Sequence, residues 1–369
     1  MSCCHGTCVV LTGLVGICVL IIFKWLYKIW KSDEGLLSLK NKTVVVTGGS
    51  SGIGLSLAKL AYSYGAHVTI IARNVVNLKK AEEEIRNQNC VSIGQIKYLS
   101  VDLTIDYYTI EKQLKQIIGL TDILINCAGG ALSKDFHQMD PENIETQMRL
   151  NYLASAHVTR IMLPAMLETK TQCRVTFVSS MAGQVGIYGL ASYSASKFAL
   201  RGLAECLQME VANRGVSVTL AFPPDTATPG FDKEQIGKPE ITKKLSSAGG
   251  LLSPDVVALS IMKSTLKGEF FSSVGLDGWL LTQLTYGMCL PYSVIDFVTL
   301  TLDAICRILE YLGIFILKQI PNTCDRIIFT FYTKANDLLS LMNTFIGPII
   351  PMAQETAISN CFFTNLFRI

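Results

Sequence analysis

Short apolar runs alternate with longer amphipathic stretches along the central part of the chain. The short runs are rich in Val, Ile and Thr, which is typical of buried strands, and they cover residues 43–47, 67–72, 96–101, 122–126, 174–179 and 216–222. The stretches between them repeat apolar residues with the period of a helix, and they cover residues 52–64, 77–87, 107–118, 141–167 and 191–213. This alternation predicts an α/β fold, a doubly wound parallel sheet covered by helices on both faces.

The amino-terminal residues follow a different pattern, one continuous apolar run. It extends from Cys8 to Phe23 and beyond, about the 20 residues that a helix needs to span a bilayer. No basic side chain precedes the run, and Lys24, Lys28 and Lys31 follow it, so the positive-inside rule places the rest of the chain in the cytosol. A cleaved signal peptide is the alternative, but the run lacks a charged n-region and a small-residue cleavage site. We therefore expect an uncleaved transmembrane anchor over residues 1–30.

A second hydrophobic region begins near residue 276. Four charged residues in its second segment fall on one helical stripe, namely Asp296, Asp303, Arg307 and Glu310. A spanning helix should not carry such a stripe, so we expect an amphipathic helix in the membrane interface, with a second spanning helix as the alternative. The predicted division is an anchor over 1–30, an α/β domain over 31–275, a membrane-associated region over 276–320 and a tail over 321–369 whose role the sequence does not indicate.

Composition agrees with membrane contact and disfavours two other classes of function. Hydrophobic residues make up 50% of the chain and charged residues 17%, and the mean hydropathy is +0.38. The net charge of +3 is not gathered in a basic run, so no nucleic-acid partner is expected. The twelve cysteines show no CxxC pattern, which is typical of reduced thiols facing the cytosol. The four histidines form no ligand motif, so no metal site is expected.

A glycine-rich segment joins the first predicted strand to the first predicted helix. Glycines at 48, 52 and 54 allow a tight turn, a close approach of the backbone to a pyrophosphate, and close packing of the helix on the strand. The amides at the start of the helix then face the phosphates. Because the segment has this strand-to-helix context, it predicts a Rossmann-like nucleotide-binding fold, with ordinary turn chemistry as the alternative. We expect cofactor contacts from Gly48, Ser50, Ser51, Gly52, Ile53 and Gly54.

The residues that end the next strands indicate which nucleotide binds. Arg73 stands where an NAD site usually has an acid, and its guanidinium suits a 2′-phosphate, to which Ser50 adds a hydroxyl. NADPH is therefore the predicted cofactor, and a surface arginine at a strand end is the alternative. Asp102 is placed to meet the adenine, and Asn126 opens a small-residue turn on the nicotinamide side. Both are also ordinary turn residues.

Tyr193 and Lys197 lie four residues apart in a segment of good helix formers, so they share one helix face. A fixed positive charge favours the phenolate and lowers the pKa of a neighbouring phenol from its usual value of about 10. The pair is a candidate proton donor to a carbonyl oxygen. A tyrosine and a lysine on a solvated helix face are the alternative.

These motifs occur together and in order, with Asn151 and Ser180 between them. The combination TGxxxGxG at 47–54, NxAG at 126–129 and YxxxK at 193–197 resembles the short-chain dehydrogenase/reductase family over about residues 41–275. The resemblance implies that Tyr193 protonates the substrate carbonyl, that Lys197 lowers the Tyr193 pKa and binds the nicotinamide ribose, and that Ser180 hydrogen-bonds the carbonyl oxygen. It also implies that Asn151 holds a water that links Lys197 to solvent.

Two further points follow from this resemblance. Ser179 is the neighbour that competes with Ser180, and the spacing to Tyr193 and the strand alternation favour Ser180. Pro223 and Thr226 begin the loop after the sixth strand, and we expect them to contact the nicotinamide. The loop is expected to continue to about residue 250 as a lid, although its Pro, Thr and Gly content is also that of an ordinary long loop.

Within the family, four segments resemble the enzymes that reduce the 3-keto group of a long-chain sphingoid base on the cytosolic face of the endoplasmic reticulum. They are VTGGSSGIG at 46–54, YSASKFALRGL at 193–203, LQMEV at 207–211 and PPDTATPG at 223–230. The resemblance implies NADPH, a bilayer, a sphingoid-base substrate and a homodimer. Membrane-bound hydroxysteroid or retinoid enzymes of the family share the catalytic residues and are the first alternative, and a non-catalytic NADPH-binding scaffold is the second. Asn77 replaces an expected lysine, which leaves more of the 2′-phosphate binding to Arg73.

Overall fold

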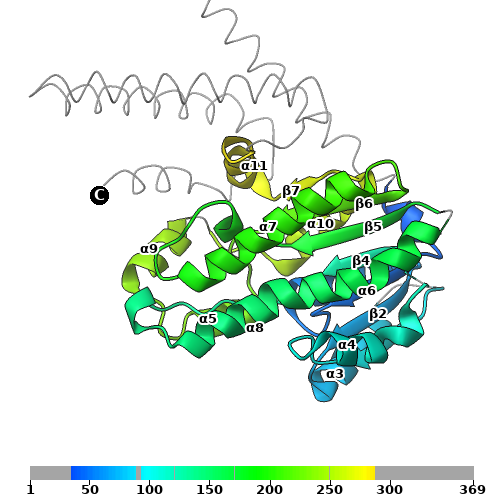
Figure 1. Cartoon of the computed structure of the whole chain (residues 1–369), viewed down its shortest axis with the longest axis horizontal. Helices are drawn as coiled ribbons and strands as arrows, with labels where there is room; N and C mark the ends of the chain where they lie inside the picture. Colours follow the sequence, from blue (N-terminus) through cyan, green and yellow to red (C-terminus); the bar gives the residue numbers. More distant parts are fainter. Residues whose placement is uncertain (1–34, 89–92, 120, 170, 249, 287–369) are drawn as a thin grey trace, which may run out of the picture.

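The computed structural model describes residues 35–88, 93–119, 121–169, 171–248 and 250–286. In these residues a seven-stranded parallel sheet has the order β3-β2-β1-β4-β5-β6-β7 (Figure 1). The strands are β1 Thr43–Thr47, β2 His67–Ala72, β3 Ile96–Ser100, β4 Ile123–Asn126, β5 Cys173–Val178, β6 Val216–Phe222 and β7 Phe271–Ser273. The helices are α2 Gly52–Ser63, α3 Val75–Arg86, α4 Tyr107–Leu114, α5 Pro141–Met148, α6 Ala154–Glu168, α7 Ala191–Val211, α8 Pro229–Glu234, α9 Glu240–Ala248, α10 Pro254–Lys267 and α11 Gly275–Leu284.

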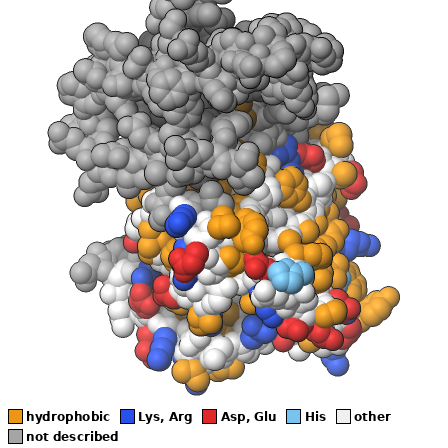
Figure 2. All heavy atoms as spheres, turned by 90° about the vertical axis from the view of Figure 1, so that its left-hand side faces the viewer, with side chains coloured by type: hydrophobic (Ala, Val, Ile, Leu, Met, Phe, Trp, Pro, Cys, Tyr) orange, Lys and Arg blue, Asp and Glu red, His pale blue; other side chains and the backbone are white. Residues whose placement is uncertain are grey.

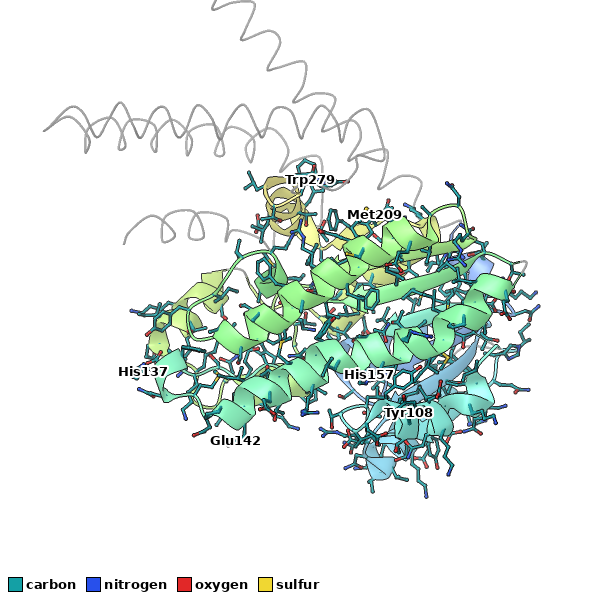
Figure 3. All side chains as sticks on the ribbon, in the orientation of Figure 1. Tyr108, His137, Glu142, His157, Met209 and Trp279 are labelled. Carbon is teal, nitrogen blue, oxygen red and sulfur yellow. The ribbon has the colours of Figure 1, made fainter. Side chains whose placement is uncertain are left out.

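The sheet separates two hydrophobic cores. Alternate residues of a strand face opposite sides, so Val44 and Val46 of β1 enter one core, and Val45 enters the other. The first core is completed by α2, α3 and α10, and the second by α4, α6 and α7. On the second side α4, which carries Tyr108, packs on α6, which carries His157 (Figure 3). The rings of Tyr107 and His157 meet there edge to face with centroids 5.5 Å apart. The predicted doubly wound α/β fold is thus confirmed.

The predicted elements differ from the structure in three places. The strand β7 was not predicted, because three residues are too few to form a recognisable apolar run. The single helix predicted over 141–167 is wrong in its middle, where residues Arg149–Leu153 form a π-helical turn between α5 and α6. The loop predicted from Pro223 to about residue 250 contains α8 and α9; Thr228 caps α8 by accepting the Phe231 N–H at 3.1 Å, with a proline in the first turn.

The predicted membrane segments fall mostly outside the described residues. This is the case for the anchor over residues 1–30 and for the part of the carboxy-terminal region beyond residue 286, including the charged stripe. Within the part of the chain that the structure describes, every helix is too short or too polar to cross a bilayer. The start of the predicted membrane-associated region forms α11, which lies beside β7 at the edge of the sheet (Figure 1).

The end of β1 is joined to the turn after β4 by one side chain. Thr47 is 1% exposed, and its hydroxyl oxygen accepts the N–H groups of Cys127 and Ala128 at 3.0 and 3.1 Å. Without this acceptor the two N–H groups would be buried and unpaired, which would lower the stability of the fold. Thr47 therefore fixes the relative position of two loops at the carboxyl edge of the sheet.

Replacing Thr47 by Val should destabilise the protein by about 2 kcal/mol or more, because two N–H groups lose their acceptor while the side-chain volume is kept. For a domain of this size that corresponds to a thermal midpoint lower by roughly 4–8 °C. Thr43→Val, at the other end of the same strand, is the matched control and should leave the midpoint nearly unchanged. Thermal unfolding of the detergent-solubilised full chain measures both. Equal midpoints for the two variants would contradict the role of Thr47.

Candidate active site

The loops that follow β1, β4, β5 and β6 meet at the carboxyl edge of the sheet. A Cβ on Gly48 would lie 2.9 Å from the Ala128 backbone, so the loops after β1 and β4 are in contact. The loop after β5 is tied to the loop after β6, because the Met181 N–H donates to the Pro223 carbonyl at 3.2 Å. In an open parallel sheet this edge is where ligands bind.

The glycine-rich loop has the form that a dinucleotide requires. Gly48 has a φ of +69°, and a Cβ on Gly54 would overlap the Gly48 carbonyl oxygen, so both positions need glycine. A Cβ on Gly52 would lie 2.8 Å from the Thr228 side chain, which brings the segment after β6 against this loop. Ser51 precedes α2 without a side-chain cap, so the first amides of α2 are open to a phosphate group. Ser50 and Ile53 lie half-buried in the same loop.

Arg73 and Asp102 lie near each other after β2 and β3. Arg73 is exposed, and its guanidinium has no ion-pair partner within the described ranges. One oxygen of Asp102 accepts from the N–H and the hydroxyl of Thr104, at 2.9 and 2.7 Å. Burial opposes ionisation of Asp102, but these hydrogen bonds and the Arg73 charge outweigh it and lower the pKa of the carboxyl. The two side chains lie near enough at the predicted adenosine end of the site for the Arg73 charge to act on Asp102, without forming an ion pair.

The amide of Asn126 is turned into the protein interior. The residue is 1% exposed, and its Nδ2 donates to the Thr159 hydroxyl of α6 at 2.9 Å. Asn126 therefore holds the turn after β4 on α6. Because its side chain is used in this way, a cofactor would contact the backbone that follows Asn126. Asn77 is exposed, and its N–H donates to the Asn74 side chain that caps α3.

Asn151 is fully buried in the π-helical turn. Its side chain clamps the backbone of Gly130, accepting the N–H at 2.9 Å and donating to the carbonyl at 3.0 Å. It also donates to the Ser196 hydroxyl of α7 at 3.0 Å. The wider turn, which is frequent at functional sites, thus connects the loop after β4 to the helix that carries Tyr193.

Tyr193, Lys197 and Ser180 are brought together by α7 and the loop after β5. Lys197 is 5% exposed, its Nζ donates to the Val178 carbonyl at 2.9 Å, and the same atom lies 5.6 Å from the centroid of the Tyr193 ring. The Ser180 hydroxyl hydrogen-bonds the Tyr193 phenol. The neighbouring Ser179 instead donates to the Lys197 carbonyl at 3.1 Å. Of the two serines, Ser180 is the one that faces the phenol.

The pKa of Tyr193 moves in the direction opposite to the expected one. Burial raises it, the hydrogen bond from Ser180 opposes the rise, and the carboxyls of Glu234 and Asp225 add to it. The expectation was wrong because loss of contact with water is the largest influence on the pKa of the buried phenol. Burial also lowers the pKa of Lys197 to about 8. The phenol therefore stays protonated at neutral pH, as a proton donor must.

The segment after β6 differs in detail from its prediction. Pro223 is buried, and its carbonyl is held by the loop after β5. Thr226 is also buried, and its hydroxyl donates to the Pro224 carbonyl at 2.8 Å. The residues missed by the sequence analysis are Asp225 and Glu234, because two acids in a loop carry no signal of their own until the fold shows what they face.

Comparison with known proteins agrees with this arrangement. Residues 42–238 match the short chain dehydrogenase family. A 3-ketodihydrosphingosine reductase of Bos taurus is 44% identical over 263 residues, 70% of this chain and 79% of the relative. A 3-dehydrosphinganine reductase of Danio rerio is 43% identical, over 68% of this chain and 76% of the relative. A solved short-chain dehydrogenase from Sphingobium yanoikuyae, in complex with NADPH, is 25% identical with a TM-score of 0.55, and the match covers 63% of this chain and 87% of that one. The chain therefore belongs to the short-chain dehydrogenase family.

Proposed function

We propose that the protein reduces 3-ketodihydrosphingosine to dihydrosphingosine with NADPH, a step of sphingolipid biosynthesis. The observation that carries the proposal is the identity of 42–44% to relatives named for this reaction, over 68–70% of the chain. The proposal is further supported by the phenol of Tyr193, the buried ammonium of Lys197 and the hydroxyl of Ser180, which lie together at the carboxyl edge of the sheet.

The four side chains have distinct tasks in this reaction. When bound, NADPH supplies the hydride. Tyr193 donates its phenolic proton to the carbonyl oxygen as negative charge develops there. Ser180, hydrogen-bonded to the same phenol, stabilises that charge. Lys197 provides a positive charge beneath the phenol, and Asn151 holds the loop and helix that define the position of Lys197.

The choice of NADPH is supported by Arg73 and by the NADPH bound in the Sphingobium yanoikuyae relative. The glycine loop, with its close backbone contacts and the uncapped start of α2, fits a dinucleotide pyrophosphate. The exposed Arg73 guanidinium offers a planar fork for the 2′-phosphate.

We also propose that the protein acts at the endoplasmic reticulum membrane with this domain in the cytosol, as a homodimer that pairs through α7. Phe198 and Met209 of α7 are exposed at 42% and 63%, which supports a partner on that helix. Figure 2 views the end of the molecule at which α5 and α9 lie and shows hydrophobic side chains among charged ones. Asn41-Lys42-Thr43 has the form of an N-glycosylation sequon. Glycosylation at Asn41 would place the domain in the lumen and contradict the proposed orientation.

A first test uses membranes that contain the expressed protein. NADPH oxidation is measured with 3-ketodihydrosphingosine and, separately, with a steroid ketone. We expect turnover of the sphingoid ketone, with Tyr193→Phe lowering it by about 10²- to 10⁴-fold because the general acid is lost, while NADPH still binds. Near-normal activity of Tyr193→Phe would contradict the site, and turnover of the steroid alone would contradict the substrate.

A second test addresses the cofactor. Arg73→Gln should raise the KM for NADPH about 10- to 100-fold, because a charge-assisted contact to the 2′-phosphate is lost, and should leave the KM for NADH nearly unchanged. Arg86→Gln, at an exposed arginine of α3, is the matched control. An equal loss with both cofactors would show that Arg73 does not recognise the 2′-phosphate.

A third test uses the pH dependence of kcat/KM. Lys197 is charged below its pKa of about 8 and neutral above it, so kcat/KM for the reduction, after correction for titration of the substrate's own amine, should be level at lower pH and fall as the pH rises through about 8. The raised pKa of Tyr193 keeps the phenol protonated over this range. The residual activity of Lys197→Arg should not fall in this way, because a guanidinium stays charged. A level wild-type profile up to the ordinary lysine pKa of about 10.4 would contradict the assignment.

A further inference from the structure

A buried group of charged side chains lies in the segment after β6. The Lys238 side chain is completely buried, and its Nζ contacts Glu234 Oε1 at 2.8 Å and the Ser246 hydroxyl at 2.7 Å. It also lies 5.2 Å from the centroid of the Phe231 ring. Ser246 in turn hydrogen-bonds the carboxyl of Asp225. Side chains from β6 to α9 are thus joined in one network at the carboxyl edge of the sheet.

This network does not balance its charge. Asp225 and Glu234 bring two carboxyls, and Lys238 brings one ammonium. Asp225 Oδ2 is buried and has no hydrogen-bond partner within the part of the chain that the structure describes. A buried carboxylate oxygen without a partner is costly. Consistent with this, burial raises the pKa of Asp225 and of Glu234, and the Asp225 charge adds to the rise at Glu234.

The network lies next to the reacting groups and to open space. The loop that contains Asp225 begins at Pro223, whose carbonyl is hydrogen-bonded to the backbone that follows Ser180. Asp225 also lines a pocket of about 220 Å³, together with Phe231, Gln235, Lys243, Ser246, Gly250 and Leu251. The cation in this lining, Lys243, pairs with Glu240 at 2.8 Å at the surface, so its charge is already compensated.

We propose that the Asp225 carboxylate, supported by Glu234, binds the ammonium group of an amino ketone substrate and so selects it over uncharged ketones. The proposal rests on the proposed function, whose substrate carries a primary amine on the carbon next to the ketone. An amine in such a position is largely protonated at neutral pH. It would bring the positive charge that the network lacks, and it would sit one carbon away from the carbonyl that Tyr193 protonates.

Three observations together favour this role over a purely structural one. A network that only fixed the segment would be satisfied by one carboxyl for one lysine, and Glu234 already supplies that carboxyl. The unpartnered oxygen belongs to Asp225, the acid closer in sequence to Pro223 and to the β6 end. Finally, both acids are near enough to Tyr193 to affect its pKa. The same feature separates the sphingoid ketone from steroid and retinoid substrates, which have no amine.

The test compares two substrates with the wild type and two variants in full-length protein. The substrates are 3-ketodihydrosphingosine and the same molecule with hydrogen in place of the amine. The wild type should prefer the amine by about 10- to 100-fold in kcat/KM, the usual effect of a charged hydrogen bond. Asp225→Asn should lower kcat/KM for the amine substrate and leave kcat/KM for the other substrate unchanged, so that most of the preference is lost. Asp232→Asn, at an exposed acid of α8, is the matched control and should behave as wild type.

Each outcome supports or overturns the proposal. Asp225→Asn that keeps the wild-type preference would overturn it, and so would a wild type that reduces both substrates equally well. The second comparison needs no variant, so it can overturn the proposal even if Asp225→Asn is misfolded and fails to bind NADPH. If the wild type reduces both substrates equally well, the proposed function stands and only the role of Asp225 is contradicted. If it reduces neither substrate, the proposed function and the role of Asp225 are both contradicted.

Discussion

The burial of Lys197 under the ends of β4 and β5 is the constraint on which the site depends. An ammonium group taken out of water needs close polar partners, and among the described residues the Lys197 Nζ donates to the Val178 backbone carbonyl. The backbone around it must therefore approach closely. A Cβ on Gly129 would lie 3.3 Å from Nζ, and a Cβ on Gly183 would lie 2.9 Å from the Lys197 carbonyl oxygen. These two glycines leave the space in which the lysine fits.

The same burial explains how the site is suited to reduction. A lysine with a pKa of about 8 is mostly charged at neutral pH, and a small further change in its pKa alters the charged fraction. Burial acts on Tyr193 in the other direction and keeps its proton in place. A phenol that holds its proton until charge develops on a neighbouring oxygen is a better donor for a ketone than one that is already ionised.

The segment after β6 links the two ends of the site. Thr228 lies against Gly52 of the phosphate-binding loop, and Thr242 of α9 donates to the Tyr188 carbonyl just before α7. The buried Lys238 network holds the chain between these two contacts. The network therefore lies between the cofactor loop and the helix that carries Tyr193, and the charges of Asp225 and Glu234 act on the phenol.

The sequence by itself determined the fold class, six of the seven strands and the chemical identity of the site. Those features depend on local patterns: apolar period, glycine where a strand turns into a helix, and a tyrosine four residues before a lysine. The tertiary structure decided the rest. The inward orientation of the Asn126 side chain, the π-helical turn at Asn151 and the raised pKa of Tyr193 each depend on burial and on partners distant in the sequence. The excess of carboxyls in the Lys238 network is seen only in the folded chain, because the energy of a charged group depends on its partners and on its access to water.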